Sequence, residues 1–146
     1  MVTQRKAMVI WIAFMVITAL ACGSFAPPES CGENIGGTAD EVKFAQYFES
    51  MELVNQSTGQ PGQEGEEGME FAKGDTLAIR VASKSEVAVR ACVQSRTGGG
   101  KIPFDQTQTL SQGQGTFSIG TLEPGSYVIR VIVNDTLVKN FPFVVK

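Results

Sequence analysis

The sequence contains no histidine, and this absence removes a large part of ordinary protein chemistry. Ser-His-Asp and Cys-His catalysis use an imidazole as the base, and most zinc and haem sites use it as a ligand. Three cysteines are too few for a four-thiolate metal site. Carboxylates or a single nucleophile remain as chemical tools, but no motif arranges them, so we expect a protein that is not an enzyme and has no metal or cofactor.

Tryptophan, tyrosine and basic residues are also scarce. Trp11 is the only tryptophan, and it lies in the N-terminal apolar run, while Tyr47 and Tyr127 both fall at positions predicted to face inward. The formal net charge is −3, and no basic cluster occurs. Because phosphate neutralisation supplies most of the affinity for nucleic acids, we expect no nucleic-acid partner.

The N-terminal segment has the three-part layout of an export signal. Arg5 and Lys6 precede an apolar run over residues 7–21, which ends in the small residues of Ala19-Leu20-Ala21-Cys22. A basic end, a short apolar core and an A-x-A site predict a signal peptide over residues 1–21, cleaved before Cys22. Since no charge occurs between Lys6 and residue 29, an uncleaved membrane anchor is an alternative.

The stretch Ala19-Leu20-Ala21-Cys22 resembles the lipobox of bacterial lipoproteins, with Ala19 at a position where that family prefers leucine. The resemblance implies that Cys22 is the lipid attachment site. The protein would then be anchored by its N-terminal lipid on the extracytoplasmic side of a membrane, in the cell envelope. A secreted protein with a free Cys22 is a second alternative to this reading.

The remainder of the chain divides into a leash and one domain. Residues 22–37 contain Pro27-Pro28 and several glycines, which is typical of a linker, and residues 38–146 are enough for one hydrophobic core. The pattern from Thr38 to Glu41 fits a capping box and predicts a helix near 39–47. Residues 56–70 are polar and glycine-rich, which predicts a solvated loop without the alternating oxygen ligands of a calcium site.

The rest of the domain alternates between apolar and polar residues, as half-buried strands do. A first strand is predicted at 48–55, with Met51 and Leu53 inward. Further strands are predicted at 76–83, 87–94, 101–110, 116–122, 127–133 and 136–145. About seven strands separated by turn residues predict an all-β, antiparallel sandwich.

One corner of this pattern has a family resemblance. The stretch from Gly120 to Tyr127 resembles the L-x-P-G-x-Y corner of immunoglobulin-like and fibronectin type III-like domains. The resemblance covers residues 48–146 and implies an immunoglobulin-like sandwich in which the Tyr127 hydroxyl ties down the preceding turn. Pro124-Gly125 predicts a type II turn there. The third strand lacks the core tryptophan of antibody domains, and their disulfide is also missing.

The cysteines can be sorted by strand direction. In the strand at 87–94, Val87, Val89 and Val93 share one face and Cys92 lies on the other. If Cys22 carries lipid, Cys31 and Cys92 remain as a disulfide pair in an oxidising compartment, pinning the leash to the domain. The alternative is a free, half-buried Cys92.

The same alternation predicts a partner face on the outside of the sheet. Its residues are Arg90, Val128, Arg130, Ile132 and Val144. An apolar strip edged by arginine is typical of protein interfaces. The alternative is that the leash covers this strip.

These observations predict a non-enzymatic envelope lipoprotein. We expect it to act as an accessory or structural subunit that docks on another cell-envelope or surface-assembly protein. The alternative function is an extracellular module that binds a ligand such as carbohydrate, although such modules usually expose aromatic side chains.

The anchor gives a first test. We expect the mature protein to begin at Cys22 and to partition into detergent, because acyl chains contribute about 0.8 kcal/mol per buried methylene. Cys22→Ser should release the protein from membranes or leave it unprocessed. Intact-mass analysis checks this, and an unmodified Met1 with the apolar run still attached would show that the segment is a retained anchor instead.

Overall fold

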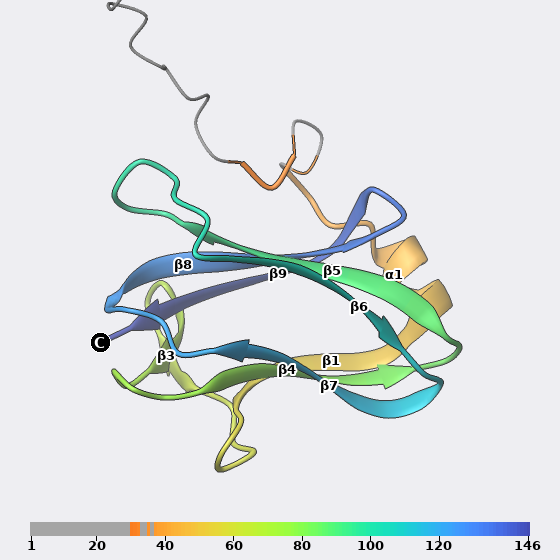
Figure 1. Cartoon of the computed structure of the whole chain (residues 1–146), viewed down its shortest axis with the longest axis horizontal. Helices are drawn as coiled ribbons and strands as arrows, with labels where there is room; N and C mark the ends of the chain where they lie inside the picture. Colours follow the sequence, from red (N-terminus) through yellow and green to blue (C-terminus); the bar gives the residue numbers. More distant parts are fainter. Residues whose placement is uncertain (1–29, 33–34, 36) are drawn as a thin grey trace, which may run out of the picture.

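The computed structural model describes residues 30–32, 35 and 37–146. The predicted signal peptide, Cys22 and the first part of the leash therefore lie outside the described residues. The described chain is mostly β-strand, in two stacked layers (Figure 1). Its elements are α1 (Glu41–Tyr47), β1 (Phe48–Asn55), β2 (Gln63–Gly65), β3 (Gly68–Phe71), β4 (Leu77–Ser83), β5 (Val87–Ser95), β6 (Phe104–Leu110), β7 (Gly113–Gly120), β8 (Gly125–Val133) and β9 (Thr136–Val145).

The two layers are a three-stranded sheet in the order β1-β4-β7 and a six-stranded sheet in the order β2-β3-β9-β8-β5-β6. The predicted all-β, sandwich-like architecture is therefore confirmed at the level of two packed sheets. The expectation of a purely antiparallel arrangement is wrong at one pair, because β3 runs parallel to β9. The β2–β3 hairpin itself lies in the segment predicted as a loop, since its glycines and glutamates give no apolar alternation.

The core lies between the sheets and contains the residues that alternation predicts. On β4 these are Leu77, Ile79 and Val81, and on β8 they include Ile129 and Val131, all at most 1% exposed. Phe117 of β7 and Phe143 of β9 fill the space between the layers. Complete burial of such a side chain contributes roughly 1.5–3 kcal/mol, so this single cluster holds the two sheets together.

The turns follow the backbone chemistry of their residues. Asn134 and Asp135 connect β8 to β9 and have φ values of 48° and 55°. Two consecutive residues with positive φ form the type I′ geometry that matches the twist of a two-residue hairpin. The predicted turn at this position is thus confirmed.

Helix α1 begins at Glu41, two residues later than predicted. The N-cap is Asp40, whose carboxylate accepts a 2.8 Å hydrogen bond from the backbone N–H of Lys43. The prediction of a capping box that starts at Thr38 is wrong at this end. The backbone N–H of Asp40 donates to the carbonyl of Leu137 at 2.8 Å, which fixes the start of the helix on β9.

The corner before β8 is built around Tyr127. Its hydroxyl donates a 2.7 Å hydrogen bond to the carbonyl of Glu123, as the sequence predicts, and its ring is 7% exposed. Gly125 does not have the positive φ of a type II turn, so that part of the prediction is wrong. A Cβ atom at this position would lie 3.3 Å from three atoms of the Tyr127 side chain, so the turn packs closely against it.

Removing this hydroxyl should weaken the domain. We expect Tyr127→Phe to lower the free energy of unfolding by about 1 kcal/mol, since it deletes one half-buried hydrogen bond and leaves the Glu123 carbonyl without it. Urea unfolding measures the change. Tyr47→Phe is the control, because the Tyr47 hydroxyl accepts only a long, exposed 3.4 Å bond from Asn134. Equal losses in the two variants would contradict a special role for the corner.

Candidate functional site

The outer face of the six-stranded sheet carries the predicted partner residues, and the strand register arranges them in rows. Arg90 stands opposite Ile132, which stands opposite Leu137. The next row holds Cys92, Arg130 and Asn140, and the one after it holds Gln94, Val128 and Pro142. Ser126 and Val144 form the last row. The leash crosses the first two of these rows, and an open groove lies beside it.

The leash is attached to this face by a covalent bond. Cys31 and Cys92 form the predicted disulfide, with their Cα atoms 5.8 Å apart. Cys92 itself is fully buried. The prediction that Cys92 points outward, toward a leash that passes over the domain, is confirmed.

Arg90 holds the leash beside the disulfide. Its guanidinium forms a bidentate ion pair with Asp105, at 2.7 Å and 2.6 Å, and its remaining Nη1 donates to the carbonyl of Cys31 at 3.0 Å. The hydrogen bond to Asp105 is the main cause that raises the pKa of Arg90 above its usual value. The arginine is thus oriented by one carboxylate, and its third guanidinium nitrogen donates to the leash backbone.

Two more side chains bind the leash farther across the sheet. Arg130 on β8 donates from Nη1 to the carbonyl of Ile35 at 3.2 Å, and from Nε to Gln94 at 3.2 Å. Asn140 on β9 donates to the carbonyl of Gly37 at 3.3 Å. The described leash residues therefore cross β5, β8 and β9 in turn, on the side of the six-stranded sheet away from the three-stranded one (Figure 1).

Beneath the leash lies a second, smaller hydrophobic cluster. It contains Cys31, Ile35, Cys92, Ile132 and Leu137, each at most 5% exposed. The sequence allows two alternatives for the outer strip, a partner face or a covering by the leash. At Ile132 the leash covers the strip. Arg90 and Arg130 are half-buried and bound to leash carbonyls. Val128 and Val144 stay half-buried on the part of the face that the leash does not cross.

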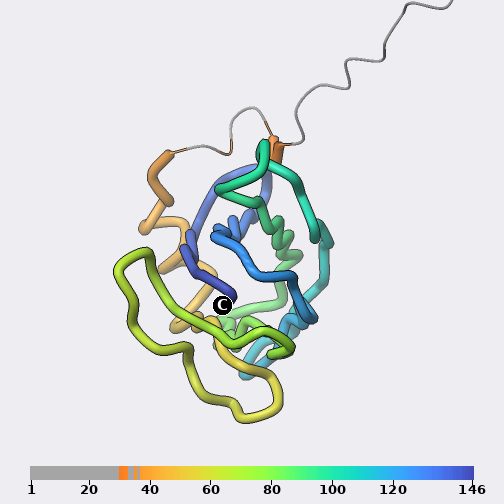
Figure 2. Tube along the Cα trace, turned by 90° about the vertical axis from the view of Figure 1, so that its left-hand side faces the viewer, coloured from red at the N-terminus to blue at the C-terminus, as the bar shows by residue number. Residues whose placement is uncertain are grey.

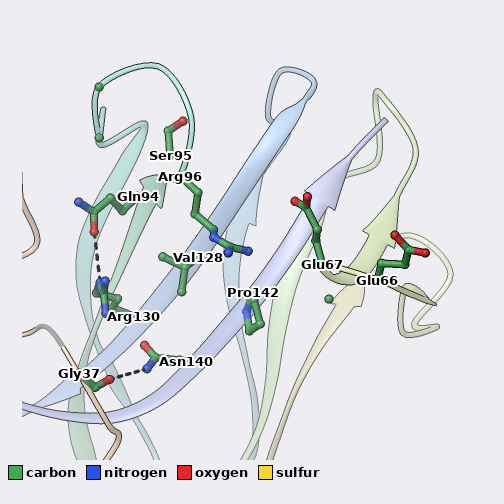
Figure 3. A pocket seen from close by; sticks show the side chains of 13 residues that line it. Gly37, Glu66, Glu67, Gln94, Ser95, Arg96, Val128, Arg130, Asn140 and Pro142 are labelled. Atoms are coloured by element: carbon green, nitrogen blue, oxygen red, sulfur yellow. Dashed lines mark hydrogen bonds between the residues drawn. The ribbon is translucent and has the colours of Figure 1, made fainter.

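This part of the face holds a groove of about 1040 Å³, which Val128 lines and Val144 does not. Its floor contains Val128 and Pro142, and Arg130, Asn140 and Gly37 lie at the end next to the leash. One wall is the β5–β6 loop and the other is the turn of the β2–β3 hairpin. Figure 3 shows Arg96 and Glu67 on these opposite sides of the floor.

The two walls carry opposite charges. Arg96 is exposed on the β5–β6 side, and Glu66 and Glu67 are exposed on the hairpin side. Glu67 accepts a 2.8 Å hydrogen bond from Ser126, which orients its carboxylate. Among the described residues, no interaction engages the side chains of Arg96 and Glu66. The groove can therefore offer one cation and one or two carboxylates to a bound polar surface.

The described residues contain no cluster of three side chains that would bind a metal ion. The same part of the chain has no helix that is long and apolar enough to cross a membrane.

Comparisons with known proteins add little. No family model matches the chain, and no curated protein matches it in sequence. A solved structure with some similarity is a beta-glucosidase from Listeria innocua, at 16% identity and a TM-score of 0.39. The match covers 66% of this chain and 16% of that protein's length. A likeness at this level assigns neither fold nor activity to the chain.

Sequence reasoning missed most of the groove. Gln94 follows Arg90 and Cys92 on the outward alternation, so the pattern held enough information to find it. The sequence predicts that Glu66 and Glu67 lie in a solvated loop, and only the pairing of β3 with β9 brings them beside the sheet. Arg96 and Pro142 lie on segments that are far apart in the sequence, and no local pattern shows that these segments meet.

The pinned leash gives a stability prediction. Replacing both cysteines, Cys31→Ala with Cys92→Ala, should lower the free energy of unfolding by about 4 kcal/mol, because the bond closes a loop with a sequence separation of 61 residues. Urea unfolding of the variant and the native protein measures this. Alkylation of native protein without reduction should label neither cysteine. A loss below about 1 kcal/mol would mean that the leash adds little to the fold.

Proposed function

We propose that this protein is a non-enzymatic accessory subunit of the cell envelope, anchored by lipid on Cys22, that docks on another envelope protein through the groove beside its leash. The observation that carries the proposal is the groove itself. It combines an apolar floor at Val128 and Pro142 with oppositely charged walls at Arg96 and Glu66. Interfaces typically place charged residues around an apolar centre in this way.

We also assign the domain an immunoglobulin-like arrangement. In that arrangement β1, β4 and β7 take the places of strands A, B and E, while β9, β8 and β5 take those of G, F and C. The Tyr127–Glu123 hydrogen bond supports this assignment, since a tyrosine at the E–F corner makes the same kind of backbone contact. Domains of this architecture commonly act as binding and structural modules, which agrees with a docking role.

Chain length ties the groove to the proposed anchor. Cys31 lies nine residues after Cys22, so a fully extended chain spans at most about 30 Å between them. Cys31 is fixed on the outer face of the six-stranded sheet, the face that also holds the groove. A lipid on Cys22 would therefore hold the groove close to the membrane, where an envelope partner also lies.

The charge pattern favours a protein over a sugar as the occupant. None of the described residues that line the groove is aromatic, whereas small-ligand sites are rich in apolar and aromatic walls. Two walls of opposite charge suit a polypeptide surface that carries both signs. Such complementarity orients a partner and raises its association rate.

Photocrosslinking tests the docking proposal. We expect a benzophenone amino acid at position 96, and a second one at position 66 on the opposite wall, to give the same protein adduct in intact membranes. Both positions are exposed, so neither replacement removes a buried contact. Mass spectrometry of the adduct identifies the partner.

Position 86 provides the matched control. Glu86 is exposed and directly precedes β5, whereas Arg96 directly follows the other end of that strand. It should give no such adduct. Adducts from all three positions, from neither wall, or containing only this chain would contradict docking through the groove.

A further inference from the structure

The edges of the two sheets differ in how well they are protected. β1 carries the exposed charges of Glu49 and Glu52, and its end bridges to Pro61. β2 is only three residues long and carries Glu64. Charges, proline and short length are the usual means by which an edge strand avoids pairing with another chain.

The opposite edges lack these means. β6 pairs only with β5, and β7 pairs only with β4. From Phe104 to Gly120 the sequence contains no proline and a single charge, Asp105, which Arg90 already neutralises in a bidentate ion pair. Figure 2 looks along the sandwich and shows β6 on its outer side. An edge of this kind offers its free backbone N–H and C=O groups to another strand.

β6 is the more exposed of these two edge strands. Its five central residues, 105–109, are all exposed, and its ends are anchored by the half-buried Phe104 and the buried Leu110. The strand is therefore held firmly in place while its middle remains uncovered among the described residues.

The sequence of β6 is nearly symmetric about its centre. When Phe-Asp-Gln-Thr-Gln-Thr-Leu is laid antiparallel on itself with Thr107 at the middle, threonine meets threonine and Gln106 meets Gln108. Asp105 then meets Thr109, whose hydroxyl can donate to its carboxylate. The apolar ends, Phe104 and Leu110, also face each other. Threonine pairs and polar pairs of this kind stabilise neighbouring antiparallel strands.

We propose that two copies of this chain pair through β6, antiparallel and centred on Thr107, to form one continuous sheet. The contact is self-complementary, as a two-fold dimer requires. The two-fold axis would stand perpendicular to the joined sheets, so both leashes lie on the same face. That geometry lets the lipids of both copies insert into one membrane. This point rests on the proposed lipid anchor, whereas the pairing of the strands does not.

Two charge variants at the same positions test the register. In Gln106→Lys with Gln108→Lys, lysines of the two copies face each other, and we expect the dimer dissociation constant to rise at least about tenfold. In Gln106→Lys with Gln108→Glu, each lysine faces a glutamate of the partner, and we expect the constant to stay within about threefold of the native value. Light scattering on the full chain in detergent, over a concentration series, measures the protein mass.

A third variant controls for charge on the other open edge. Gln114→Lys with Thr116→Lys places two lysines at exposed positions of β7 and should leave the dimer intact. Circular dichroism shows that each variant is folded. A native chain that is monomeric at every concentration overturns the proposal, as does equal behaviour of the two β6 variants or dissociation by the β7 variant. Loss of docking through the groove would leave these masses unchanged, so the two proposals fail separately.

Discussion

The attachment of the leash to the outer face of the six-stranded sheet is the constraint on which much of this structure depends. Ile132 and Leu137 are apolar residues that alternation directs away from the main core. The disulfide brings the leash over them, and Ile35 completes their cover. A crossing backbone needs partners for its carbonyls, and Arg90, Arg130 and Asn140 supply them. The chain thus uses its outward polar residues to bury its outward apolar ones.

The same contacts shape the candidate site. Arg130 and Asn140 bind the leash and also line the end of the groove, so the covering of one half of the face defines the boundary of the other half. The charged side chains that nothing engages in the described structure, those of Arg96 and Glu66, lie on the two walls. The charged side chains proposed to meet a partner therefore differ from those that hold the leash, so the walls can be changed without loosening it.

The sandwich-like fold is also asymmetric at its edges. The side with β1 and β2 is interrupted by charges and by a short hairpin, whereas β6 and β7 form a nearly uncharged margin. Natural sheets generally protect exposed edges, so an unprotected one is informative about association. The near-symmetry of β6 about Thr107 is the reason for proposing a second copy of the chain as the partner of that margin.

The sequence by itself determined the features that depend on local pattern. Alternation placed Met51, Ile79 and Ile129 inward, Asn134-Asp135 marked a hairpin, and the outward position of Cys92 predicted its bond to Cys31. Only the tertiary structure decided features that depend on distant segments meeting. Leash residues cover Ile132, β3 joins β9 in parallel, and the hairpin turn faces Arg96 across the groove. Period and propensity describe one strand at a time, whereas burial depends on what the rest of the chain lays across it.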